Sequence, residues 1–182
     1  MANLIQIPNC IGIDCSIGYA QEIVYDTLQL TWDASWNCYP RIYKNKKKSK
    51  DSDEEFFVPE FLLGNYEYTT DTLFDDTVDV VSYFLVGDIR PVNEGDLRAN
   101  VSLVFSCLIN RLYNVSQKAD EQMHRDIIYA LRQLPSSWTL NAMSTGVDEV
   151  YREFTKKELN YSDMSNRHLC RFDFELDYSI DC

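Results

Sequence analysis

The sequence predicts an α+β fold in which a mostly antiparallel sheet packs against one or two helices. Three observations carry this prediction. Residues 172–181 alternate strictly between apolar and polar side chains, residues 116–134 carry an apolar stripe at helical spacing, and the apolar runs at 78–86 and 100–110 are typical of buried strands. The resulting order of strand, strand, helix, strand, strand favours an antiparallel layer over a parallel α/β sheet.

Length and composition predict one globular domain over residues 1–182. A chain of 182 residues can bury about 70% of the surface that its extended form exposes. Its content of 45% hydrophobic and 25% charged residues is average for a globular protein. Within this domain we expect an N-terminal arm at residues 1–15 and a charged loop, the tongue, at residues 44–56. No apolar run approaches 18 residues, so no membrane span is expected.

The first half of the chain gives three local predictions. Residues 1–13 are mildly apolar and are broken by a proline and a glycine, which indicates an arm or an edge segment. Residues 16–31 carry apolar side chains at every third or fourth position, which predicts a helix. Residues 56–63 are apolar, but Pro59 bars them from the centre of a sheet because proline cannot donate a ladder hydrogen bond.

The second half has the clearest patterns. The apolar stripe of residues 116–134 predicts a long helix, which Pro135 closes. Residues 147–154 are expected to form a strand that Gly146 introduces. The last strand, residues 172–181, places its even-numbered residues in the core and its odd-numbered residues in solvent.

The tongue combines two blocks of opposite charge. The simpler interpretation of the tongue is a solvated loop. The alternative is a subunit interface in which the basic half of one tongue meets the acidic half of the next. The residues of this candidate interface are Lys44, Lys46, Lys47, Lys48, Lys50, Asp51, Asp53, Glu54 and Glu55.

The solvent face of the last strand forms an acidic row. Its four carboxylates stand about 7 Å apart along the strand and repel each other, so we expect this face to stay unburied unless partners are present. One interpretation is a sheet face that charge keeps soluble. Another is the wall of a channel that carries DNA without gripping it. The candidate channel-facing residues are Asp173, Glu175, Asp177 and Asp181.

Charge and motifs exclude several function classes. With 17 basic and 29 acidic residues, the formal charge of −12 argues against wrapping DNA or docking on anionic lipid. Neither the G-x-G-x-x-G motif nor the P-loop pattern occurs. We therefore expect no enzyme and no cofactor. A clustered-acid nuclease or hydrolase is a remaining alternative, and divalent-metal binding together with loss of activity in Asp173→Ala would favour it.

The histidines and cysteines offer weak alternatives to a structural role. Asp120 and His124 lie one helical turn apart and could hold a metal, although an exposed helix pair explains them as well. His168 and Cys170 would point the same way on a strand, but no third group orients them. Two cysteines near the N-terminus fit no common zinc spacing. The six cysteines are expected to be reduced, and we predict no catalytic or metal residues.

Several segments resemble structural proteins of tailed bacteriophages, in particular a virion protein of crAss-like, short-tailed phages. The layout of the second half is also similar to that of tail-completion, or tail-terminator, proteins. Residues 40–182 carry the resemblance, while the N-terminal third and the tongue depart from the tail-terminator pattern. The segments are PRIYKN (40–45), VPEFLLGNYEY (58–68), LFDDTVDVVSYFLVGD (73–88), NVSLVFSCLINRLY (100–113), KADEQMHRDIIYAL (118–131), VYREF (150–154) and DMSNRHLCRFDFELDY (163–178).

The resemblance implies a tail-terminator-like fold and a structural role. It implies a homo-oligomeric ring of six or twelve copies at the head-to-tail junction, in contact with portal, neck and tail proteins, through which DNA passes without specific binding. Such a protein is assembled in the bacterial cytoplasm and resides in the virion. The alternative from a different class is a free acidic inhibitor that mimics DNA and blocks a host nucleic-acid enzyme.

Overall fold

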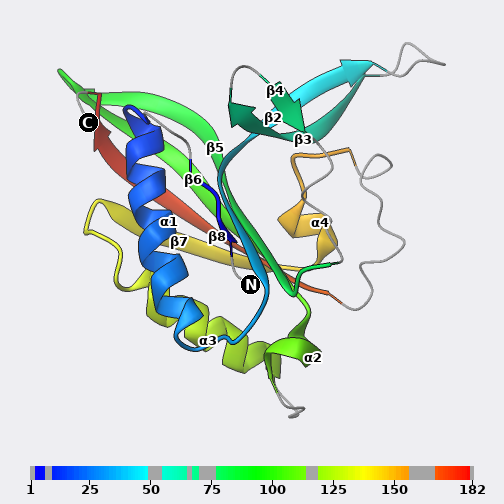
Figure 1. Ribbon diagram of the computed structural model, residues 1–182. Coiled ribbons are helices and arrows are strands. Elements are labelled where there is room, and N and C mark those ends of the chain that lie inside the picture. Colours follow the sequence, from blue (N-terminus) through cyan, green and yellow to red (C-terminus); the bar gives the residue numbers. More distant parts are fainter. Residues whose placement is uncertain are drawn as a thin grey trace.

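The computed structural model shows one mixed sheet with its two long helices packed on the same face (Figure 1). It describes residues 3–6, 10–48, 55–64, 67–69, 77–113, 119–155 and 167–180. The predicted α+β class is confirmed. The sheet order is β4-β3-β2-β5-β6-β8-β7, and β1 pairs alongside β2. All strand pairs are antiparallel except β1–β2 and β2–β5.

The strands differ greatly in length, and the longest ones form the middle of the sheet. The strand bounds are β1 Asn3–Leu4, β2 Trp36–Lys48, β3 Glu55–Gly64, β4 Glu67–Thr69, β5 Val80–Asn93, β6 Asp96–Cys107, β7 Trp138–Thr145 and β8 His168–Ser179. β5, β6 and β8 contain the apolar runs and the alternating segment that predicted buried strands, so these predictions are confirmed.

Two long helices and two short ones complete the described fold. They are α1 Ile13–Gln29, α2 Ile109–Leu112, α3 Ala119–Leu131 and α4 Val147–Val150. α1 and α3 correspond to the helices predicted at 16–31 and 116–134, and their apolar stripes are buried. The N-terminal arm ends at Gly12, whose positive φ of 56° starts α1. Within the described part of the arm, residues 3–4 form β1, an edge segment as expected.

The core between the sheet and these two helices is built around aromatic side chains. Trp32 and Trp36 pack with ring centroids 5.8 Å apart, and Phe105 contacts both rings. Phe172 of β8 meets Phe105 edge-on at 6.3 Å. The even-numbered residues of β8 therefore face the helices, as the alternation predicted.

The strand predicted at residues 147–154 is wrong. This segment forms α4 and a following turn, because Val150, Tyr151 and Phe154 recur at helical spacing and bury one side together. The true strand, β7, lies just before it. β7 is almost fully exposed along both faces, so its residues carry no alternation that would have revealed it.

The tongue is also not simply a loop. Residues 44–48 extend β2, and Glu55 begins β3, whereas residues 49–54 lie outside the described part of the chain. The opposite charges meet across the two strands: Lys46 pairs with Glu55, and Lys47 pairs with Glu60 at 2.8 Å. Cross-strand ion pairs of this kind favour strand pairing over a solvated loop.

Pro59 lies within β3, but it occupies a position where no described neighbouring strand requires a hydrogen bond from its nitrogen. The backbone of Phe57 faces away from β2, since its N–H and carbonyl bond to Thr155. Two residues on, the nitrogen of Pro59 faces the same outer side. β4 begins to pair only at Phe61, so no described strand needs a hydrogen bond from Pro59.

β2 leaves the main sheet halfway along its length. It pairs with β5 as far as Ile42, opposite Leu85, and from there only with β3. The end of β2, together with β3 and β4, forms a second arm, distinct from the N-terminal one. Figure 1 shows this arm of strands leaning away from β5, with α4 nearby. A cleft opens between this arm and the sheet, on the face opposite α1 and α3.

Candidate functional site: the charged cleft

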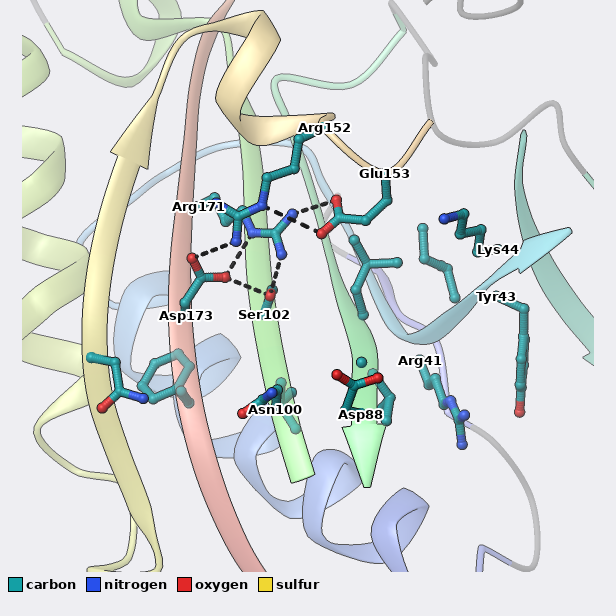
Figure 2. Close-up of a pocket in the computed structure, with 17 residues that line it drawn as sticks. Arg41, Tyr43, Lys44, Asp88, Asn100, Ser102, Arg152, Glu153, Arg171 and Asp173 are labelled. Carbon is teal, nitrogen blue, oxygen red and sulfur yellow. Dashed lines mark hydrogen bonds and ion pairs between the residues drawn. The ribbon is translucent and has the colours of Figure 1, made fainter. Parts of the chain in front are cut away.

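The cleft has a volume of about 560 Å³ and a polar, charged lining. β2 supplies Arg41, Tyr43 and Lys44 on one side, β6 and β8 supply the floor, and the turn after α4 closes one end (Figure 2). Four basic and three acidic side chains line it, in a protein whose overall charge is −12. The charged residues are Arg41, Lys44, Arg152, Arg171, Asp88, Glu153 and Asp173.

A buried guanidinium anchors the floor of the cleft. Only 5% of the Arg171 side chain is exposed. Its nitrogens donate to Asp173 at 2.7 Å, to the Ser102 hydroxyl at 2.7 Å and to Glu153 at 2.5 Å. Burial acts to lower the pKa of Arg171, but the bonds from Glu153 and Asp173 outweigh it and raise that pKa. Arg171 therefore stays charged and holds β8 to the turn after α4.

Asp173 is the acidic counterpart of Arg171. It also accepts hydrogen bonds from Ser102 at 2.6 Å and from Arg152 at 3.0 Å (Figure 2). Burial acts to raise the pKa of Asp173, but the bonds from Ser102 and Arg171 prevail and hold it below its usual value. All charges of this cluster are matched within the chain, so the cluster is a structural tie between β6, β8 and α4.

The strand register explains why these residues meet. Asp173 faces Ser102 across the β6–β8 ladder, and Arg171 faces Val104 two residues along. Side chains two apart on a strand point to the same face, so Arg171 and Asp173 lie together. The predictions missed Arg171, although this spacing to Asp173 was visible in the sequence. Glu153 and Arg152 gave no signal, because only the placement of α4 brings them close.

The acidic row of β8 is paired rather than bare. Glu175 pairs with Arg90 at 2.6 Å and with Arg98 at 3.8 Å, and Arg98 also forms a two-pronged pair with Asp177 at 2.5 and 2.7 Å. The carboxylates were expected to leave this face unburied unless partners were present, and at residues 173, 175 and 177 such partners are present. The cause is the register, which places Arg98 of β6 directly opposite Asp177. Asp181 lies outside the described residues.

The predicted tongue interface is only partly described. Lys44 lies over the ring of Phe57, with its ammonium 4.1 Å from the ring centre, and Lys46 and Lys47 pair within the arm. Lys48 is described in its backbone alone. Lys50, Asp51, Asp53 and Glu54 lie outside the described residues. The structure thus assigns three of the lysines to contacts inside the arm.

The histidine and cysteine pairs considered from the sequence are arranged differently. His124 meets His168, with their Nε2 atoms 2.9 Å apart. Cys170 is fully buried, and burial raises its pKa well above the usual thiol value, which is unsuited to a nucleophile. Cys15 donates to the carbonyl of Cys10 at 2.9 Å. Over the ranges that the structure describes, no group of three histidine, cysteine or acidic side chains is placed to hold a metal.

No family model matches the sequence, and no curated protein shows significant similarity to it. None of the described helices is both long and apolar enough to cross a membrane.

Proposed function

We propose that this protein is a structural subunit of a tailed-bacteriophage virion, and that its copies close into a ring at the junction of head and tail. The observation that carries the proposal is that, within the described part of the chain, no further strand pairs with the outer side of β4 at one end of the sheet or of β7 at the other. The sequence resemblance supplies the virion context. The ring would help to seal the portal–tail channel and let DNA pass.

β7 is an edge built for pairing. Its eight residues, WTLNAMST, include no charge and no proline, although 25% of the whole chain is charged. Proteins that stay monomeric protect such edges with lysine, proline or a covering segment. No described strand covers the outer side of β7, and two of its apolar residues, Leu140 and Met143, are 43% and 37% exposed. A strand from another copy can satisfy this edge.

The positions of the two edges favour a ring. They are different surfaces at opposite ends of one sheet, so a contact between β7 of one copy and the arm of the next is heterologous. Heterologous contacts generate closed rings when the rotation between copies closes. The arm, stiffened by its ion pairs between β2 and β3, extends away from the sheet and is the element that reaches a neighbour (Figure 1).

The pairing of the acidic row alters the proposed channel wall. Glu175 and Asp177 share Arg90 and Arg98, so this face offers DNA phosphates a mixture of charges rather than a bare anionic strip. The overall charge of −12 still disfavours adhesion of DNA. The same pairing weakens the DNA-mimic alternative, because a mimic needs carboxylates that are free to replace phosphates.

The test measures the mass of the untagged full-length protein by native mass spectrometry and images the product by electron microscopy. We expect closed rings of uniform copy number. The double variant Leu140→Lys and Met143→Lys places charges on the β7 edge and should yield folded monomers. Tyr129→Lys is the matched control, because Tyr129 is an apolar residue of α3 that is 63% exposed and belongs to neither edge strand. Its rings should persist.

Two results would contradict the proposal. One is a wild-type protein that remains monomeric at high concentration and is absent from purified virions. The other is a double variant that forms the same rings as the wild type. Reversal of Lys46, Lys47 and Lys48 to glutamate should also weaken assembly, but it breaks the ion pairs within the arm too, so the β7 variant is the cleaner test.

A further inference from the structure

We propose that His124 and His168 form a binding site for a divalent transition-metal ion of the nickel or copper type, in which both imidazole Nε2 atoms are ligands. The inference is independent of the ring proposal. These are the only two histidines in the chain, and they lie 44 residues apart in sequence on different elements. The fold nevertheless brings their Nε2 atoms to 2.9 Å from each other.

Both ligands are held by rigid elements. His124 lies on α3 beside Met123, which is fully buried in the core. His168 begins β8 and faces Cys107 of the central strand β6, with Leu169 buried next to it. The two rings, with centroids 5.0 Å apart and planes inclined by 53°, are therefore positioned before any ion binds.

The spacing selects the kind of ion. With metal–nitrogen bonds of about 2.0–2.1 Å, two nitrogens 2.9 Å apart subtend an angle of about 90° at the metal. That angle suits octahedral or square-planar coordination, which is characteristic of Ni²⁺ and Cu²⁺, whereas tetrahedral Zn²⁺ requires the nitrogens to move apart. Burial is the main cause that lowers the pKa of both histidines, which favours the neutral form that binds metal. In the metal-free protein one Nε2–H donates to the other Nε2, so an ion bound by both Nε2 atoms takes the place of that proton, and both rings then carry their N–H at Nδ1.

The remaining coordination positions fall to water, and two carboxylates, those of Asp120 and Glu121, act electrostatically on His124. Asp120 lies one helical turn before His124, and its charge acts on both imidazoles. Among the described residues no third protein ligand completes the set. We therefore assign two direct ligands and give Asp120 an outer role, in which its negative charge favours a bound cation.

The experiment titrates untagged, chelator-stripped full-length protein with NiCl₂ by isothermal titration calorimetry. We expect one site per chain in the wild type and loss of that site in His124→Asn and in His168→Asn. Asp120→Asn should weaken binding by about tenfold. The control is Cys10→Ser with Cys15→Ser, which removes the half-buried thiols of the N-terminal region and should leave the site intact. Lowering the pH to 5 should weaken binding, because protons compete for the imidazoles.

A second measurement keeps the test independent of how well the variants fold. The electron paramagnetic resonance spectrum of the wild-type protein with one equivalent of Cu²⁺ should show hyperfine coupling to two nitrogens. A spectrum of thiolate ligation, Ni²⁺ binding that survives both histidine substitutions, or no binding at 1 mM NiCl₂ would each overturn the assignment.

Discussion

Over residues 171–177, the two faces of β8 are held by different physics. On the face toward α1 and α3, its even-numbered residues pack among aromatic rings. On the opposite face, its odd-numbered residues from 171 to 177 are charged and ion-paired, whereas Leu169 before them is buried in a second apolar cluster. The first face is stabilised by apolar area, which tolerates variation in detail. The second depends on particular partners, so losing one of them leaves a charge uncompensated.

The largest effect is expected on the apolar face. Phe172→Ala removes a fully buried ring that packs against Phe105 and should lower the free energy of unfolding by about 3–5 kcal/mol. Urea denaturation followed by circular dichroism measures the change. Ile180→Ala is the control, because Ile180 is 56% exposed, and it should cost less than about 0.5 kcal/mol. Equal costs at the two positions would contradict the assignment of the core face.

On the ionic face, the loss of stability should depend on whether the charges of the remaining partners are also removed. Arg171→Met removes the shared partner of Glu153 and Asp173 and should cost about 3 kcal/mol in the free energy of unfolding. Adding Glu153→Gln and Asp173→Asn to Arg171→Met removes the stranded charges and should recover at least half of the loss. A triple variant that is less stable than Arg171→Met would show that packing, and not charge, dominates this face.

Acid should weaken the ionic face before the apolar one. The folded pKa of Asp173 lies below the ordinary value of 3.8, so the folded state binds fewer protons there than the unfolded state. Its contribution to stability is complete above pH 3.8 and is lost as the pH falls through the lowered value. The difference in stability between wild type and Asp173→Asn should therefore shrink between pH 5 and pH 2.5. A constant difference would exclude the charge of Asp173 as its source.

The sequence predicted the apolar face far better than the ionic one. The helices α1 and α3 and the strand β8 were predicted because periods of 3.6 and 2 are local properties of the chain. The strand β7, the helix α4 and the strands of the arm were not predicted. An exposed edge strand shows no alternation, and a run of lysines is as compatible with a loop as with a strand. The cluster around Arg171 depends on the β6–β8 register, which no local pattern encodes.

The acidic row shows that a pattern on one strand also cannot predict the net charge of a candidate functional surface. Alternation correctly placed Asp173, Glu175 and Asp177 on one face, but it could not show that Arg90 and Arg98 come to meet them from a hairpin some 80 residues earlier. A charge pattern on one strand therefore predicts which way side chains point. The net charge of the face depends on the strands that pair beside it.

The smallest effect is expected where the ionic face reaches solvent. Arg98 pairs with Asp177 through two hydrogen bonds, which raise the pKa of Arg98 and lower that of Asp177, but both side chains are well exposed. Water and salt screen exposed pairs, so Arg98→Gln should leave the urea midpoint close to that of the wild type, and the remaining difference should vanish in 1 M NaCl. Arg171→Met should keep its cost in the same salt, because the Arg171 side chain is only 5% exposed. If the two substitutions respond alike to salt, burial does not separate the inner and outer parts of this face.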